Sequence, residues 1–279
     1  MPQATTDHRR LTDALVAIVD AAGREIMTVY ESDFDVDTKE DDSPLTQADL
    51  ASHRLIRDAL RDLTPDIPLL SEESNAPDFA TRRSWNRYWL VDPLDGTKEF
   101  VNRNGEFTVN IALIEGHRAV LGIVGVPAQG VTYTGDVTSR RAERRDQDGI
   151  REIKARRMDR ARELVVVASR SHGGERLEMF ITELSRRFRS VERTPVGSSL
   201  KLCILAEGRA DLYPRLGPTS EWDIAAAHAV LQAAGGAVWT FDRAPLMYNT
   251  KESLLNPEFL AVADDAFDWW ATLPAIASA

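Results

Sequence analysis

Residues 89–100 read Trp89-Leu-Val-Asp92-Pro-Leu-Asp95-Gly96-Thr97-Lys98-Glu99-Phe100. This is an apolar strand that runs straight into two carboxylates three residues apart, and strand ends that open into loops are common places for functional sites. Pro93 fixes one backbone angle and Gly96 can adopt conformations closed to other residues, so both acids can turn toward one point. Hard cations such as Mg²⁺ require oxygen ligands gathered in this way. The simpler alternative, that Asp-Pro and Asp-Gly only form turns, stays open for this stretch alone.

A second apolar stretch, upstream of the first, also ends in acids. It reads Leu69-Leu-Ser71-Glu72-Glu73-Ser74. Adjacent like charges at the end of a strand repel one another unless a cation or water relieves the repulsion. A solvated loop explains Glu72 and Glu73 as well as a metal site does, so this motif leaves both interpretations open.

Two further acids stand at the predicted starts of helices. Thr46 precedes Asp49 by three residues, and Ser220 precedes Asp223 by the same distance, which is the spacing of a capping box. Each acid is therefore expected to hold the first turn of its helix. A helix start also favours a phosphate or an acidic ligand, so capping does not exclude a role in a site.

Outward from these motifs, the pattern of apolar residues predicts helices and strands along the chain. One helix is predicted over 11–29, capped by Thr6 or Asp7, and a second over 44–63. Strands are predicted at 67–70, 88–91, 107–114, 120–126 and 131–133. In the second half, strands at 164–168 and 210–213 alternate with helices at 175–188, 198–206 and 221–234.

A basic segment separates the two halves. Residues 140–162 contain ten Arg or Lys against five acids and interrupt the pattern of strands. A chain of 279 residues is near the size at which one core divides into two. The sequence therefore predicts an α+β lobe at 1–139, a charged connecting segment at 140–162 and an α/β lobe at 163–279.

Composition excludes several classes of protein. The chain has 44 Asp or Glu against 34 Lys or Arg, a net charge of −10, which argues against a nucleic-acid polymer as partner. No run approaches the roughly 20 apolar residues of a membrane span, and residues 1–10 lack the apolar core of a signal peptide. The single Cys203 allows no intramolecular disulfide. A cytoplasmic protein is expected, with peripheral association with the inner membrane left open.

Other familiar chemistries leave no signature in the sequence. There is no Gly-Lys dipeptide of a P-loop, no GxGxxG after a strand, no HExxH and no GxSxG. The five His are scattered, which argues against a His-based zinc site. Cys203 lies in an apolar helical stretch and is interpreted as a packing residue rather than a nucleophile.

Taken in order, the acidic motifs resemble those of the inositol monophosphatase superfamily of lithium-sensitive, Mg²⁺-dependent phosphatases. The motifs are Ser71-Glu72-Glu73, Asp92-Pro-Leu-Asp95-Gly96-Thr97 and Glu221-Trp222-Asp223. Over nearly the whole chain the sequence is most similar to the 3′(2′),5′-bisphosphate nucleotidase branch. Inositol monophosphatases typically have Thr-Asn in place of Lys98-Glu99. The segments that carry this likeness are Lys98 to Phe100, Arg103 to Asn110, Ser169 to His172, Gly197 to Lys201 and Tyr213 to Asp223.

The resemblance implies a fold and a catalytic apparatus. The implied fold is a layered αβαβα sandwich of the inositol monophosphatase and fructose-1,6-bisphosphatase type. Thr97, paired with Asp49, would orient and activate the attacking water, with Glu73 in support. Two or three Mg²⁺ would be held by Glu72, Asp92, the carbonyl of Leu94, Asp95 and Asp223.

The resemblance also implies a substrate, a small phosphorylated nucleotide. In this branch 3′-phosphoadenosine 5′-phosphate is hydrolysed to AMP and phosphate, and 3′-phosphoadenylyl sulfate is a second candidate. Read without the resemblance, Lys201 and Arg215 are surface cations and 169–172 is a polar loop. The implied contacts with substrate are Glu72, Gly96, Thr97, Lys98, Ser169, His172, Ser198, Lys201, Arg215 and Asp223.

Two other functions compete with the nucleotidase. One is an inositol monophosphatase or fructose-1,6-bisphosphatase activity. The other belongs to a different class, a non-catalytic protein that binds a divalent cation or a nucleotide for regulation. A monomer or a homodimer is expected in each case.

Overall fold

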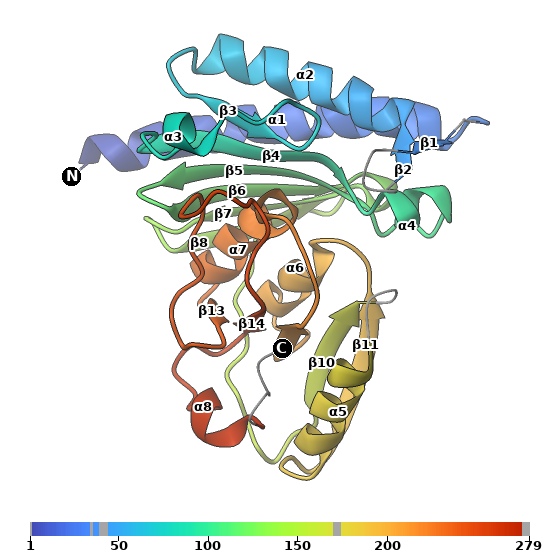
Figure 1. Cartoon of the computed structure of the whole chain (residues 1–279), viewed down its shortest axis with the longest axis vertical. Helices are drawn as coiled ribbons and strands as arrows, with labels where there is room; N and C mark the ends of the chain where they lie inside the picture. Colours follow the sequence, from blue (N-terminus) through green and yellow to red (C-terminus); the bar gives the residue numbers. More distant parts are fainter. Residues whose placement is uncertain (1, 34–35, 39–43, 170–173, 275–279) are drawn as a thin grey trace.

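The computed structural model describes residues 2–33, 36–38, 44–169 and 174–274. Figure 1 shows helices and sheets stacked in alternating layers, with a pair of helices on top, a first sheet, a second pair of helices, a second sheet and a last layer of helices. The αβαβα sandwich expected from the sequence is confirmed. The helices are α1 (Pro2–Tyr30), α2 (Gln47–Leu63), α3 (Phe79–Arg82), α4 (Thr97–Val101), α5 (Gly174–Ser185), α6 (Leu200–Ala206), α7 (Glu221–Ala233) and α8 (Trp269–Thr272).

The first sheet has the strand order β3-β4-β5-β6-β7-β8-β9, with β3 parallel to β4 and every other pair antiparallel. Both faces are covered, so its central strands are apolar over most of their length. Along β4, Trp89 and Val91 pack with α1 and α2, while Tyr88 and Leu90 pack on the side of α7. The strands are β3 (Leu69–Ser71), β4 (Arg87–Asp95), β5 (Thr108–Glu115), β6 (Arg118–Val126), β7 (Val131–Asp136), β8 (Arg141–Asp146) and β9 (Gly149–Glu152).

Helix α7 lies directly against the backbone of this sheet. A Cβ atom at Gly122 would lie 2.0 Å from the carbonyl oxygen of Ala226, and one at Gly135 would lie 2.3 Å from the Cα of Val230. Glycine in β6 and β7 therefore allows the alanine-rich helix to approach closely. This contact fixes the position of the helix whose first turn carries Asp223.

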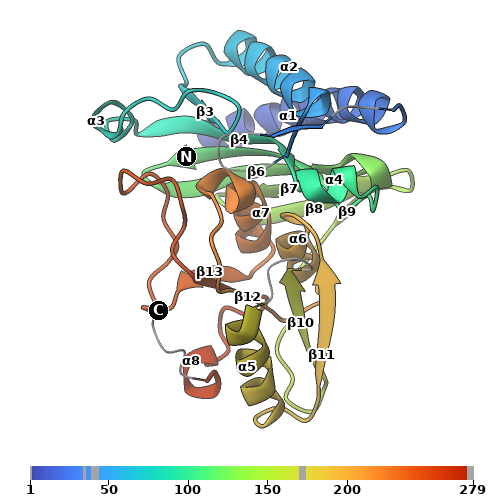
Figure 2. The same cartoon turned by 45° about the vertical axis from the view of Figure 1, so that its right-hand side comes forward.

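The second sheet has the order β11-β10-β12-β14-β13 and lies below α6 and α7 (Figure 2). Strands β11, β10 and β12 are parallel, and β14 runs antiparallel to β12 and β13. Leu184 of α5 and Trp269 of α8 close the core on its far face. The strands are β10 (Leu164–Ser169), β11 (Val191–Val196), β12 (Leu212–Arg215), β13 (Ala237–Thr240) and β14 (Phe259–Val262).

Several boundaries differ from the sequence prediction. The helix predicted over 44–63 begins at Gln47, because Pro44–Thr46 forms strand β2 and pairs with β1 (Val36–Thr38). The strand predicted over 88–91 continues to Asp95, past Pro93. A short 3₁₀ turn, Pro127–Gln129, joins β6 to β7.

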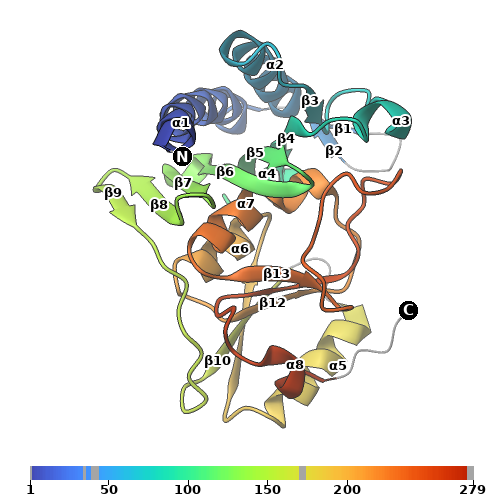
Figure 3. The same ribbon diagram turned by 90° about the vertical axis from the view of Figure 1, so that its left-hand side faces the viewer.

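The basic segment 140–162 does not interrupt the strand pattern. It supplies β8 and β9, which extend the first sheet, and only then does the chain cross to β10 (Figure 3). Its cations are paired with acids from both halves. Arg145 contacts Asp13 of α1 at 3.2 Å, and the Arg156 Nε donates to Asp211 at 2.7 Å. The local positive charge is thus largely neutralised, while the division of the chain into 1–139, 140–162 and 163–279 stays a prediction.

Among the described residues, no helix is both long and apolar enough to cross a bilayer.

Candidate active site

The predicted acidic motifs meet at one cavity of about 360 Å³. It lies where the end of β3, the turn from β4 into α4, the starts of α6 and α7, and the end of β12 come together. A Cβ at Gly96 would lie 3.3 Å from the Cβ of Ser198, so the turns before α4 and α6 touch each other. Predicted residues that line the cavity are Glu72, Asp95, Gly96, Thr97, Lys98, Ser169, Ser198, Lys201, Arg215 and Asp223.

A bulge at the end of β4 brings its two acids to the same region. Residues three apart point to opposite faces of a regular strand. Here the pairing with β5 shifts register between Asp92 and Asp95, and such a shift re-aims side chains. Asp92 Oδ1 accepts a hydrogen bond from the backbone N–H of Leu94 at 3.0 Å, which holds the turn.

The buried acids raise one another's pKa. Burial raises the pKa of Asp92 well above its ordinary value, and the charges of Glu72, Asp95 and Asp223 raise it further. Burial, with the charge of Asp223, raises the pKa of Asp95 to about 8. Burial also raises the pKa of Asp223, against the opposing effect of hydrogen bonds from Thr219 and Ser220. Acids in this arrangement repel one another when ionised.

The donor set of this acidic cluster (Glu72, Asp92, Asp95, Asp223) suits a hard cation. All its side-chain donors are carboxylate oxygens, the ligands that Mg²⁺ prefers. A bound cation would offset the repulsion between these carboxylates when they are ionised. Within the described residues, no three His, Cys, Asp or Glu side chains already stand as a closed metal cage.

The predicted catalytic pair is in contact. The Thr97 hydroxyl donates to Asp49 Oδ1 at 3.4 Å, and it also lies 3.5 Å from the carbonyl oxygen of Leu94. Asp49 Oδ2 accepts from the backbone N–H of Thr46 at 2.8 Å and from its hydroxyl at 2.6 Å. The capping box is therefore confirmed, and it turns Oδ1 of the same carboxylate toward Thr97.

Helix α2 also fixes the strand ends around the site. Ser52 donates its hydroxyl to the carbonyl oxygen of Pro93 at 2.7 Å, and the His53 Nδ1 lies 3.0 Å from the hydroxyl of Ser71. One helix thus contacts the bulged end of β4 and the end of β3. Asp49 is carried by the same helix, so its distance from both acidic motifs is set by packing.

Two cations face the acids from the second half of the chain. Lys201 is buried, its Nζ donates to the carbonyl oxygen of Val196 at 3.2 Å, and it lies 5.4 Å from the centre of the Tyr213 ring. Burial lowers the pKa of Lys201 to about 8. The Arg215 Nε donates to the carbonyl oxygen of Gly217 at 3.1 Å. The cavity therefore has an acidic side and a cationic side, which suits a ligand with two anionic groups.

Some predicted residues lie outside the cavity wall, and others were missed. Asp92 and Leu94 are buried beneath it, and Asp49 reaches it through Thr97. Burial lowers the pKa of His53, and the charge of Glu73 opposes this effect. His172 lies outside the described residues. Lining residues that the sequence analysis did not assign include Glu99, Ser199, Tyr213, Trp222 and Leu255. All of these except Leu255 fall inside segments quoted above, so membership of such a segment was the available signal.

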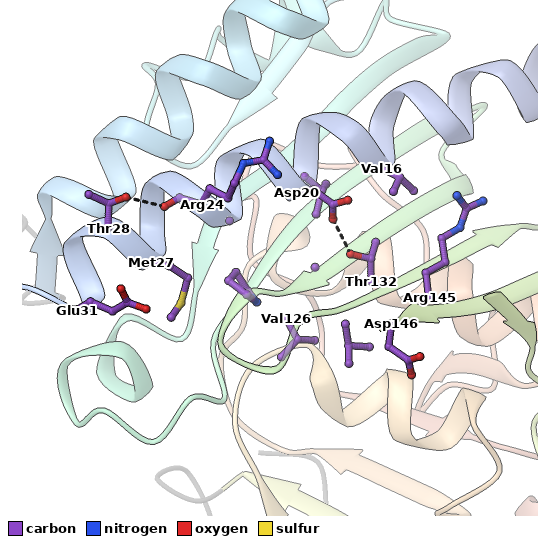
Figure 4. A pocket seen from close by; sticks show the side chains of 16 residues that line it. Val16, Asp20, Arg24, Met27, Thr28, Glu31, Val126, Thr132, Arg145 and Asp146 are labelled. Carbon is purple, nitrogen blue, oxygen red and sulfur yellow. Dashed lines mark hydrogen bonds between the residues drawn. The ribbon is translucent and has the colours of Figure 1, made fainter. Parts of the chain in front are cut away.

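A larger cavity, of about 630 Å³, lies between α1 and the strands β6 to β8 (Figure 4). Met27 of α1 and Glu31, which directly follows this helix, border it on one side, and Arg145 and Asp146 of β8 on the other. Its acids are dispersed, and Asp20 accepts a hydrogen bond from the Thr132 hydroxyl at 3.0 Å. The clustered carboxylates of the smaller cavity, rather than its volume, therefore make it the candidate site.

The fold and the site define a class of protein. Residues 7–272 match the model of the inositol monophosphatase family, and the chain belongs to that family. Among curated proteins, it is 47% identical over 251 residues to the 3′(2′),5′-bisphosphate nucleotidase CysQ of Escherichia coli K12, covering 89% of this chain and 98% of the relative. It is 34% identical over 265 residues to the CysQ of Haemophilus influenzae, covering 95% and 97%.

Comparison with solved structures points to the same family. The crystal structure of CysQ from Bacteroides thetaiotaomicron has a TM-score of 0.80 and 38% identity, covering 91% of this chain and 97% of that one. An inositol monophosphatase from Anabaena shares the fold, with a TM-score of 0.72 at 23% identity and coverage of 96% and 98%.

Proposed function

We propose that this protein is a Mg²⁺-dependent 3′(2′),5′-bisphosphate nucleotidase that hydrolyses 3′-phosphoadenosine 5′-phosphate to AMP and phosphate. The observation that carries the proposal is a single cavity with the Asp49–Thr97 pair and the acidic cluster on one side and Lys201 and Arg215 on the other. The 47% identity to CysQ of Escherichia coli supports the choice of substrate. The sulfonated relative, 3′-phosphoadenylyl sulfate, offers the same 3′-phosphate and is a second candidate substrate.

The protein's own residues account for the position of the attacking water. The Thr97 hydroxyl gives its one proton to Asp49 Oδ1, so its oxygen is left to accept a hydrogen bond from water. That bond aims a lone pair of the water at the phosphorus, and Asp49 draws proton density away through Thr97. Glu73 is proposed as a supporting acid. The backbone of Gly96 and Thr97 and the side chains of Lys98, Ser169, Ser198 and His172 are proposed contacts for the substrate.

The metal would be held by the carboxylates of Glu72, Asp92, Asp95 and Asp223 and by the carbonyl of Leu94. Bound Mg²⁺, two or three ions, would supply the positive charge that offsets repulsion between the acids and the phosphate and lowers the pKa of a nearby water. Lys201 and Arg215 would bind the second phosphate, and their fixed positions would orient the ester for in-line attack.

The proposal is tested by measuring phosphate release from three substrates side by side. Purified protein with Mg²⁺ is supplied with 3′-phosphoadenosine 5′-phosphate, inositol 1-phosphate or fructose 1,6-bisphosphate, and a parallel set contains EDTA. We expect the bisphosphate nucleotide to be hydrolysed with the highest kcat/KM, and EDTA to abolish turnover. Activity confined to inositol 1-phosphate or to fructose 1,6-bisphosphate would replace the nucleotidase with the corresponding phosphatase.

A non-catalytic regulator would release phosphate from none of the three substrates and is expected to have a damaged water-activating pair, whereas Asp49 and Thr97 are both present. The metal mechanism is tested separately by the variant Asp92→Ala. In the proposed enzyme this variant loses turnover because a buried metal-binding carboxylate is gone, while full turnover in the variant would remove the metal mechanism. Lithium is expected to inhibit, by competing with Mg²⁺ at the acidic cluster. A cytoplasmic location, with peripheral association with the inner membrane left open, and a monomeric or homodimeric state stay predictions.

A further inference from the structure

A buried ring of three polar side chains lies between the acidic cluster and the turn that carries Lys201. Ser199 donates its hydroxyl to Asn110 Oδ1 at 2.8 Å, and Asn110 Nδ2 donates to Thr108 Oγ1 at 3.2 Å. Thr108 Oγ1 and Ser199 Oγ are 2.8 Å apart and close the ring. All three residues are at most 1% exposed. We call Thr108, Asn110 and Ser199 the polar ring.

The polar ring is bonded to Asp95 at two points. The backbone N–H of Ser199 donates to Asp95 Oδ2 at 2.5 Å, and the Thr108 hydroxyl lies 3.4 Å from the same oxygen. Both protein donors thus approach the same oxygen, Oδ2. Asp95 belongs to β4 of the first sheet and Ser199 precedes α6, so the ring joins the acidic cluster to a segment more than a hundred residues along the chain.

The hydroxyl protons of the polar ring link Asp95 to Ser199. A hydroxyl has one proton to donate. Since Ser199 gives its proton to Asn110, Thr108 must be the donor in the contact that closes the ring. Its proton can point to Ser199 Oγ at 2.8 Å or to Asp95 Oδ2 at 3.4 Å, but not to both fully. A change in the charge or position of Asp95 therefore changes the hydrogen bonding of Ser199.

The turn at residues 197–198, which directly precedes Ser199, is tightly constrained. Ser198 has a φ of 47°, a left-handed backbone that a residue with a side chain adopts only under constraint. Gly197 donates its N–H to Glu106 Oε2 at 2.7 Å, and a Cβ at Gly197 would lie 2.6 Å from the Cγ of Glu99. Lys201 follows in the first turn of α6, so a shift of Ser199 moves the cation as well.

We propose that the polar ring is a positioning device that makes binding of the divalent cation at Asp95 and binding of the nucleotide at Ser198 and Lys201 mutually dependent. The inference rests on the proposed function for the identity of the two ligands. Thr108 and Asn110 lie outside the residues that line the cavity, and the hydroxyl and backbone N–H of Ser199 are engaged by Asn110 and Asp95, so the ring acts through Asp95 and Lys201. Because coupling between two binding equilibria is reciprocal, each ligand is expected to tighten the other by the same factor.

The experiment measures that factor directly. Isothermal titration calorimetry gives the Kd of Mg²⁺ for the full chain with and without saturating AMP, the proposed product, so no turnover is required. We expect AMP to tighten Mg²⁺ binding by about five-fold or more in the unmodified protein, the lower end of typical coupling. In Thr108→Val, which keeps the shape and removes the hydroxyl, the ratio is expected to fall close to one.

Two comparisons separate positioning from packing. Thr108→Ser loses a buried methyl but keeps the hydroxyl, so positioning predicts that it retains coupling, whereas packing predicts that it is the worse variant. Thr132→Val makes the same change at a buried threonine of β7 that also donates to a carboxylate, at 3.0 Å, away from the site. It is expected to leave coupling unchanged. Ser199→Ala, which keeps the backbone N–H, serves if Thr108→Val fails to fold.

The outcomes distinguish this inference from the proposed function. Unmodified coupling in both Thr108→Val and Ser199→Ala, or equal loss in Thr108→Ser and Thr108→Val, would overturn the role of the ring, as would a ratio of one in the unmodified protein. Failure of the proposed function appears instead as absence of Mg²⁺-dependent phosphate release from 3′-phosphoadenosine 5′-phosphate by the unmodified protein.

Discussion

At the scale of single residues, Asp49 has two tasks that use different oxygens of one carboxylate. Oδ2 accepts from the backbone and hydroxyl of Thr46 and caps α2, whereas Oδ1 accepts from Thr97. The sequence supports the first task by spacing alone, and the second only through resemblance to a family. The structure brings both together because the capping contact itself orients the carboxylate.

The substitution Asp49→Asn separates these tasks. An amide oxygen can still accept from Thr46, so we expect the free energy of unfolding to fall by no more than about 1 kcal/mol. The amide cannot draw a proton from Thr97, so kcat is expected to fall by about 100-fold or more, with little change in KM. Steady-state kinetics and urea denaturation provide the two numbers. Asp78→Asn, at the exposed cap of α3, is the matched control and should change neither.

His228 provides a residue-scale prediction about pH. Burial lowers its pKa to about 4, and its Nδ1 lies 2.8 Å from the hydroxyl of Tyr248. Since the unfolded chain takes up this proton near pH 6.5 and the folded protein only near 4, stability is full above 6.5 and falls as pH drops between these values. The difference corresponds to roughly 3 kcal/mol. Urea denaturation at a series of pH values from 4 to 7 gives the free energy of unfolding at each pH. We expect this free energy to change less with pH in His228→Gln than in the unmodified protein, and an equal change in both would contradict the prediction.

The predictability of the site differs between its acids and its buried neutral residues. Acids that follow apolar strands or stand at helix starts are conspicuous in the sequence, and Glu72, Asp95 and Asp223 line the cavity as expected. Thr108 and Asn110 are polar residues two positions apart in an otherwise apolar strand, so the sequence indicates that they share one face of β5. Their partner Ser199 comes from a distant segment, and no local pattern identifies such a contact.

At the scale of elements, the long helices with a clear periodicity were predictable from the sequence, and the short strands at the edges of the sheets were not. Helices α1, α2 and α7 have clear apolar faces or caps, and all three are present. Strand β11 is mostly exposed at the edge of its sheet, and its sequence Val191–Val196 contains charged residues and Pro195. Strand β8 contains three Arg, and each of these cations pairs with an acid nearby, while β9 pairs with β8 at the edge of the sheet. Tertiary pairing therefore determines these strands more than propensity does.

The contact between α7 and the first sheet supports an element-scale prediction. Gly122→Ala would place a Cβ 2.0 Å from the carbonyl oxygen of Ala226, so helix and strand must separate. We expect a loss of about 1–3 kcal/mol in the free energy of unfolding, and weaker Mg²⁺ binding because α7 carries Asp223. Thermal denaturation and calorimetry measure the two effects. Gly217→Ala, where nothing lies within 4 Å of the added atom, is the control, and equal destabilisation by both would refute this account.

At the scale of the whole molecule, the uneven charge of the chain serves two purposes. The net charge of −10 includes the acidic cluster, which is reserved for cations in the proposed mechanism. The basic excess of 140–162 is neutralised by acids on both sides, including Asp13 of α1, Glu207 after α6 and Asp211 before β12. The connecting segment is thereby attached to elements that precede and follow it.

Asp211 is the acid on which this attachment depends most. It is 1% exposed, it receives Arg156 and Arg162, and its Oδ2 also accepts from the backbone N–H of Val165 at 2.8 Å. Asp211→Asn would leave two cations without their buried counter-charge, which typically costs about 3–5 kcal/mol. We expect a matching fall in the free energy of urea unfolding, with kcat unchanged where the variant is folded, because Asp211 is outside the cavity. Asp58→Asn, which removes an exposed partner of Arg57, should change stability by less than about 1 kcal/mol. If the two variants unfold at the same urea concentration, the segment is held by packing rather than by its ion pairs.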